Sequence, residues 1–113
     1  MIFERIQKKI KSGDNIPKPR SRKAKVIEIK PNKNNELSLY YTIGSKVNFK
    51  YVTKSDFEKA FDILNKRNEL TRNWFDNNLD KKNSNPCNYT IIGSIFEMLG
   101  EAKFACTGLY VKI

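Results

Sequence analysis

The clearest pattern of hydrophobic and polar positions lies between residues 37 and 52. Apolar residues alternate with polar ones over 37–43 and again over 47–52, which is typical of two half-buried strands. A Gly-Ser pair between them predicts a tight hairpin turn, because glycine tolerates the positive φ that such a turn requires. The alternation assigns to the buried side Leu39, Tyr41, Phe49 and Tyr51. The opposite side is then polar, aromatic and basic, with Tyr40 and Lys50 on it.

Three further elements precede this hairpin. Apolar residues recur at near-helical spacing over residues 2–10, which predicts a short amphipathic helix that Gly13 would terminate. Residues 14–23 contain two prolines among basic residues, so we expect an extended, solvated strap. Residues 24–30 alternate and predict a strand, which a polar loop connects to the hairpin.

The second half of the chain is predicted to be mainly helical. The sequence Ser55-Asp56-Phe57-Glu58 matches a capping box and predicts a helix that runs to about residue 68. Thr71 can cap a second helix that ends near residue 79. Residues 90–99 are apolar almost throughout and predict a central core helix closed by Gly100. Residues 109–113 alternate again and predict a last strand.

These elements predict an α+β fold in a single domain over residues 1–113. We expect an N-terminal helix, a three-stranded antiparallel meander, a three-helix layer and a C-terminal strand that joins the sheet. No run of residues approaches the length of a membrane span, and the start of the chain has no signal-peptide pattern. The two cysteines, Cys87 and Cys106, form no CxxC pair, which favours a reducing, cytoplasmic setting.

The charge distribution makes this picture more specific. The net charge is +10, and residues 1–54 carry all of the excess, with fourteen basic groups against four acidic ones. Residues 55–113 carry eight of each, so their charges cancel. Segregated positive charge concentrates polyanions around a protein, which indicates a partner rich in phosphate. A chain that simply uses lysine as its default solubilising residue is the plain alternative.

Residues that carry catalytic chemistry are scarce. The chain has no histidine, which removes the commonest general base and all histidine-containing metal sites. Its glycines are too scattered for a phosphate-binding loop, and two cysteines without histidine cannot form an ordinary structural zinc site. Cys87 precedes the third helix and could be a nucleophile, but no candidate base accompanies it. We therefore expect no cofactor and favour a non-catalytic protein.

One enzymatic pattern is nevertheless present. The tripeptide Glu28-Ile-Lys30 on a predicted strand, preceded by Asp14, resembles part of the PD-(D/E)xK nuclease motif. That resemblance implies a Mg²⁺-dependent nuclease in which the two carboxylates bind the metal and the lysine polarises water. The pattern departs from the motif because Asp14 follows Ser12-Gly13 and does not lie on a strand after proline. Cleavage that is insensitive to Glu28→Gln and Lys30→Ala would exclude this alternative.

A winged-helix arrangement is a further alternative, since three helices followed by a strand are compatible with it. The connection between the second and third helices is longer than a helix-turn-helix needs. The helix that would enter the groove is apolar, and the positive charge lies in the other half of the chain. The basic strap and the sheet are therefore better candidates for binding.

The sequence predicts a small module that binds DNA or RNA without catalysis. Its expected contacts with nucleic acid are Lys8, Lys9, Lys11, Lys18, Arg20, Arg22, Lys23, Lys25, Lys30, Tyr40 and Lys50. In this hypothesis Tyr40 stacks on a base, while Lys30 and Lys50 contact phosphates. The alternative outside this class is a protein-interaction module whose basic arm, residues 1–23, engages an acidic protein partner. A homodimer through the terminal strand or a strip at Thr90 and Ser94 is also compatible with the sequence.

Overall fold

A computed structural model describes residues 1–17, 24–44, 49–79 and 87–113. The elements in chain order are α1 (Ile2–Lys9), β1 (Asn15–Ile16), β2 (Ala24–Pro31), β3 (Leu37–Ile43), β4 (Lys50–Thr53), α2 (Lys54–Arg67), β5 (Glu69–Thr71), α3 (Arg72–Asn78), α4 (Cys87–Met98), β6 (Ala102–Cys106) and β7 (Leu109–Lys112). The α+β class expected from the sequence is confirmed.

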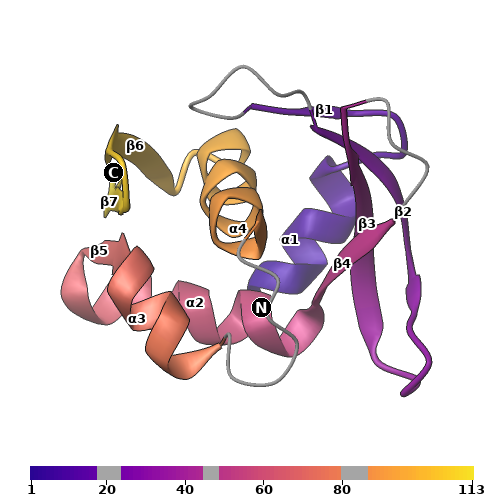
Figure 1. The fold of residues 1–113 in the computed structure, drawn as a ribbon, viewed down its shortest axis with the longest axis horizontal. Helices are drawn as coiled ribbons and strands as arrows, with labels where there is room; N and C mark the ends of the chain where they lie inside the picture. The colour runs from indigo at the N-terminus through magenta and orange to yellow at the C-terminus, as the bar shows by residue number, and fades with distance from the viewer. Residues whose placement is uncertain (18–23, 45–48, 80–86) are drawn as a thin grey trace.

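The strands form two antiparallel sheets on either side of α4 (Figure 1). The N-terminal sheet has the order β1-β2-β3-β4, and the C-terminal sheet has the order β5-β7-β6. The N-terminal sheet curls around α1, while α2 and α3 run along one side of the molecule (Figure 1). Helix α4 therefore contributes to the burial of apolar surface on both sheets.

Helix α4 is the centre of the core, as its apolar sequence predicts. Every residue from 88 to 96 except Thr90 is buried, which is the burial of a helix surrounded by protein. On the side of the N-terminal sheet, the Tyr41 hydroxyl donates a hydrogen bond of 2.5 Å to Asn88 Oδ1. On the side of the C-terminal sheet, the Tyr110 hydroxyl lies 3.4 Å from Ser94 Oγ. Gly100 ends this segment with a φ of +76°, as predicted.

The prediction that the C-terminal strand joins the meander is wrong. Strand β7 pairs with β5 and β6 and forms the centre of a separate sheet. The sequence gives little sign of either partner, because β5 has three residues and β6 is interrupted by a register shift between Phe104 and Cys106. The predicted meander itself is confirmed as β2-β3-β4, and β1 extends it by a short strand.

Both expected dimer contacts are used within the chain. Strand β7 has a neighbour on each side, so it offers no free edge for a second copy. The small-residue strip on α4 receives the Tyr110 ring, which contacts Ser94 and the Thr90 carbonyl oxygen. The strip is therefore occupied by a side chain of the protein's own strand β7.

In the second strand of the hairpin, the buried and exposed sides are the reverse of those predicted. Tyr51 lies opposite Tyr40, and Val52 lies opposite Leu39 in the ladder between β3 and β4. Val52 is completely buried, whereas Phe49 is 63% exposed. The wholly apolar Val52 fixes the alternation, because it fits the core better than Tyr51, whose hydroxyl would need a buried partner. Phe49 and Tyr51 were thus predicted on the wrong side.

The expected capping box at Ser55 is also wrong. Helix α2 begins two residues earlier than that box implies, and Thr53 Oγ1 caps it by accepting a hydrogen bond of 3.1 Å from Asp56 N. Ser55 instead donates from its backbone N–H and its hydroxyl to the Glu36 carboxylate. Glu58 reaches a different helix and accepts a hydrogen bond of 3.0 Å from Phe3 N in the first turn of α1. The predicted cap of α3 by Thr71 is confirmed.

Candidate nucleic-acid interface

The outer face of the N-terminal sheet carries a pair of tyrosines. Leu39, Tyr41 and Val52 are completely buried on the inner face, so the residues that alternate with them point outward. Tyr40 on β3 and Tyr51 on β4 are direct cross-strand partners on this outer face, with ring centroids 5.3 Å apart and planes tilted by 34°. Both side chains are partly exposed, so this pair is open to solvent.

The ammonium group of Lys30 lies over the Tyr40 ring. Its Nζ is 4.9 Å from the centroid of the Tyr40 ring and 3.1 Å from Glu28 Oε1. The Lys30 and Glu28 side chains are each 51% exposed, so the pair is largely solvated. Glu28 is the direct ladder partner of Tyr40, so one row across three strands carries Glu28, Tyr40 and Tyr51. This row presents aromatic surface together with a cation held at its edge.

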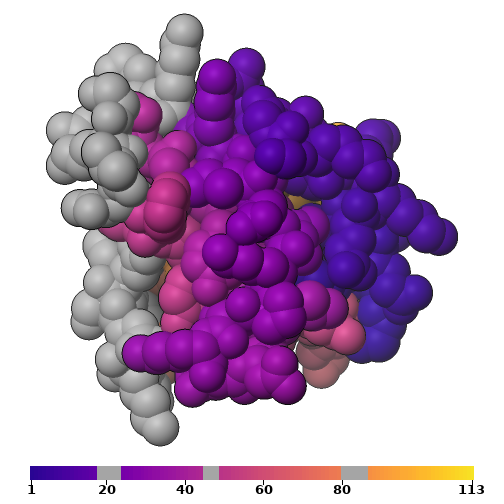
Figure 2. Space-filling view, turned by 90° about the vertical axis from the view of Figure 1, so that its right-hand side faces the viewer, coloured from indigo at the N-terminus to yellow at the C-terminus, as the bar shows by residue number. Residues whose placement is uncertain are grey.

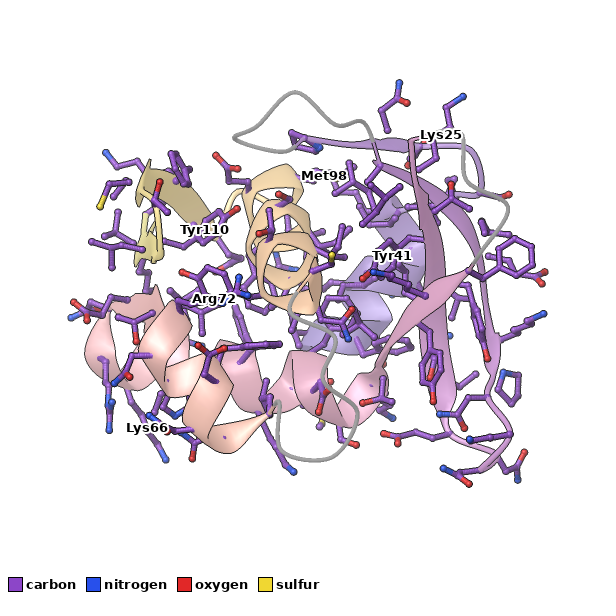
Figure 3. The ribbon with its side chains drawn as sticks, in the orientation of Figure 1. Lys25, Tyr41, Lys66, Arg72, Met98 and Tyr110 are labelled. Atoms are coloured by element: carbon purple, nitrogen blue, oxygen red, sulfur yellow. The ribbon has the colours of Figure 1, made fainter. Side chains whose placement is uncertain are left out.

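Lys25 extends the outer face toward β1. It pairs with Asn15 on one side and with Thr42 on the other, and it is exposed. Its neighbours Ala24 and Val26 are buried, which fixes the outward direction of the lysine. Lys25 points away from the protein, whereas Tyr41 points from β3 toward α4 (Figure 3). In the space-filling view, the N-terminal residues border the outer face of β2 and β3 (Figure 2).

Helix α1 adds cations next to this face. Its apolar side chains are buried, so the polar residues on the opposite side of the helix face solvent. Lys8, Lys9 and the following Lys11 are exposed. In the part of the chain that the structure describes, none of these three lysines forms an ion pair with a carboxylate, and neither does Lys25. Arg5 differs, because its guanidinium pairs with Glu101 at 2.7 Å.

Lys50 does not lie on the face with Tyr40, so its predicted location is wrong. It lies opposite Tyr41 in the ladder and therefore points to the inner side of the sheet. Its Nζ is 3.5 Å from Sγ of Cys87, the first residue of α4. The reversed alternation of β4, set by Val52, moves Lys50 inward and Tyr51 outward. Tyr51 is thus the member of the surface that sequence reasoning missed.

Four of the expected contacts, Lys18, Arg20, Arg22 and Lys23, lie outside the described residues. The described residues on either side of this segment are neighbours in the sheet, since Asn15 pairs with Lys25 and Ile16 pairs with Ala24.

The three residues of the nuclease alternative are engaged in other contacts. Asp14 Oδ2 accepts a hydrogen bond of 2.8 Å from Lys11 N, and the Asp14 carbonyl oxygen accepts one of 2.9 Å from Val26 N. Glu28 pairs with Lys30 on the outer face. Within the described ranges, no group of three cysteine, aspartate or glutamate side chains is placed to hold a metal ion.

The second half of the chain has the element order expected of a winged helix. Elements α2-β5-α3-α4-β6-β7, with the strand order β5-β7-β6, give three helices and a small antiparallel sheet. Helix α4 would be the one that enters a DNA groove in such an arrangement. Its residues from 91 to 96 are all buried, however, with α1 and the N-terminal sheet on one side of the helix and the C-terminal sheet on the other (Figure 1). A groove contact through α4 would require these elements to move apart.

Comparisons with protein-family models, with curated proteins and with solved structures gave no match. No helix in the described part of the chain is long and apolar enough to cross a bilayer.

Proposed function

We propose that this protein is a non-catalytic nucleic-acid-binding module. Its binding surface is the outer face of the N-terminal sheet together with the exposed side of α1. We call the cations Lys8, Lys9, Lys11 and Lys25 the basic border of this surface. The observation that carries the proposal is that these four exposed cations have no carboxylate partner among the described residues, in the half of the chain that holds the entire charge excess.

The other half of the chain differs in its charge balance. Lys66 pairs with Asp62 at 3.1 Å and Arg72 pairs with Asp76 at 3.3 Å, while its remaining described cations form no ion pair. Its eight basic groups are nevertheless matched by eight acidic ones, so it has no net charge. A uniform use of lysine for solubility would give both halves a similar excess of positive charge. The contrast in net charge between them favours a surface that attracts phosphate.

Unpaired surface cations bind a phosphate backbone mainly by releasing counterions. If about 4–8 phosphates are neutralised, log affinity falls against log salt with a slope of about −3 to −7.

Fluorescence anisotropy with labelled DNA and RNA oligonucleotides tests the proposal, at about 50 and 200 mM salt. We expect binding to all strongly charged probes at low salt and a steep loss at high salt. The triple variant Lys8→Glu, Lys9→Glu, Lys25→Glu should lose binding by about tenfold or more at low salt. The matched control, Lys59→Glu, Lys66→Glu, Lys103→Glu, changes the net charge equally at exposed positions of the other half.

The control should lose less affinity than the basic-border variant, because its substitutions lie outside the proposed surface. An equal loss in the two variants would contradict the location of the surface. Absence of binding to every probe at low salt would overturn the function itself.

A further inference from the structure

We propose that the ligand is single-stranded nucleic acid and that unpaired bases stack on Tyr40 and Tyr51. This inference deepens the proposed function and rests on it. It gives the tyrosine pair a role in base stacking, which binding by charge alone would not require.

The five tyrosines of the chain fall into two groups. Tyr41, Tyr89 and Tyr110 are buried, and each hydroxyl has a hydrogen-bond partner within the protein. Their rings fill the core around α4. The hydroxyls of Tyr40 and Tyr51 make no hydrogen bond within the described residues, and their side chains remain partly exposed on the outer face. The protein thus leaves two rings in contact with water, next to each other.

The arrangement of the two rings suits bases better than a duplex. In a double helix the bases are stacked on one another, so a protein reaches only their edges from the grooves. Unpaired bases can instead stack on aromatic side chains, as they do on sheet surfaces that bind single strands. Tyr40 and Tyr51 lie side by side on neighbouring strands, with centroids 5.3 Å apart. This spacing gives adjacent bases two neighbouring rings.

The charged groups around the pair fit the same ligand. Lys30 Nζ lies over the Tyr40 ring, 4.9 Å from its centroid. A base that stacks on this face takes the place of the ammonium group, which is then free to meet the phosphate of the same nucleotide. Glu28 holds that ammonium group at 3.1 Å and leaves its second carboxylate oxygen for another donor. A carboxylate repels phosphate but accepts hydrogen bonds from the amino groups of bases. A carboxylate within the aromatic row is therefore better explained by bases at this position than by backbone alone.

Three probes of one length separate base stacking from charge. They are a single-stranded oligonucleotide, the duplex of the same sequence, and a chain of abasic residues that keeps the phosphates. We expect the native protein to bind the single strand at least about tenfold more tightly than the duplex or the abasic chain. Each stacked base should contribute a factor of roughly 5–150.

Variants locate the stacking site. Tyr40→Ala with Tyr51→Ala should weaken single-strand binding by about tenfold or more and leave abasic binding nearly unchanged. Tyr40→Phe with Tyr51→Phe should keep native single-strand binding, because both rings remain for stacking and the two hydroxyls form no hydrogen bond within the described residues. Trp74→Ala on α3 is the matched control, since it removes a partly exposed aromatic side chain far from this sheet (Figure 1).

The outcomes separate the two proposals. Equal affinity for all three probes would overturn base stacking and leave electrostatic binding intact. Retained single-strand affinity in the double alanine variant would also overturn it. Circular dichroism checks that the variant is folded; if it is not, the abasic comparison with native protein decides. Absence of binding to every probe would overturn both proposals.

Discussion

Gly93 on α4 and Tyr110 on β7 are packed so closely that a Cβ atom at position 93 would lie 2.2 Å from Tyr110 Cε2. The ring is buried and its hydroxyl lies near Ser94 and the Thr90 carbonyl oxygen, so it has no free direction in which to move. This contact joins α4 to the C-terminal sheet, as the views of Tyr110 and the helix show (Figure 3).

Gly93→Ala should therefore destabilise the protein by about 1–3 kcal/mol or more, measured from urea denaturation midpoints. Thr90→Ala, one turn earlier on the same helix, is the control and should change stability by less than about 1 kcal/mol. Combining Gly93→Ala with Tyr110→Leu should cost less than the sum of the two single changes, because the smaller side chain makes room. Strict additivity would contradict the close contact.

The other side of α4 is held by a buried hydrogen bond. Tyr41→Phe removes the hydroxyl that donates to Asn88 Oδ1 and leaves this acceptor without that donor in the core. The expected loss of stability is about 1–3 kcal/mol. Tyr51→Phe removes an outer-face hydroxyl and should change stability by less than about 0.5 kcal/mol. Equal effects of the two substitutions would contradict the difference between inner and outer tyrosines.

Asp56 gives the stability a dependence on pH. Burial raises the pKa of its carboxyl above the ordinary 3.8 and the Glu36 carboxylate adds to the rise, while Lys59 opposes it. Between 3.8 and the raised folded value, the folded protein binds more protons than the unfolded chain does. The free energy of unfolding contributed by this group therefore falls as pH rises through that window.

Asp56→Asn should remove this part of the pH dependence, measured as denaturation midpoints across the acidic range. Asp62→Asn, at an exposed position of the same helix, is the control and should keep the native profile. Parallel profiles for native protein and Asp56→Asn would contradict the raised pKa.

Glu28 should have an effect on binding opposite in sign to that of its neighbours. Glu28→Gln removes a negative charge from the binding surface and releases Lys30, so affinity for the abasic chain should rise by roughly two- to fivefold. Glu69→Gln, exposed on β5, is the matched control for net charge and should have less effect. Reduced affinity of Glu28→Gln for the abasic chain would contradict the proposed surface. A Mg²⁺-dependent cleavage abolished by the same change would instead favour the nuclease alternative.

Much of the fold follows from local sequence, because burial and periodicity agree there. The core position of α4, the Thr71 cap and the β2-β3-β4 meander are all visible in the pattern. The pairing of β7 is not, because it depends on a partner of three residues and on another with an irregular register. Such contacts join distant segments and leave no local periodicity.

The candidate site shows the same limit at single residues. Lys30 and Tyr40 lie on one face as the alternation of β2 and β3 implies, whereas Lys25 joins them only because the register shift between Val26 and Glu28 reverses the alternation of β2. Tyr51 and Lys50 each lie on the face opposite to the predicted one, because Val52 and not Phe49 is the buried residue of this segment. Either assignment of β4 places an apolar residue in the core, so the alternation of apolar and polar residues alone could not decide which side is buried. The signal that could have chosen is the hydroxyl of Tyr51, which favours the wetter side.

The position of α4 between the two sheets also sets an order of events during translation. The N-terminal sheet is complete once residue 53 has been made, but α4, which lies with α1 and α2 on its inner side, spans 87–98. Until that helix leaves the ribosome, the inner face lacks part of its cover, and Tyr41 lacks the Asn88 side chain to which its hydroxyl donates a hydrogen bond. Nascent chains that stop before α4 should therefore be the form most prone to aggregation and most dependent on chaperones.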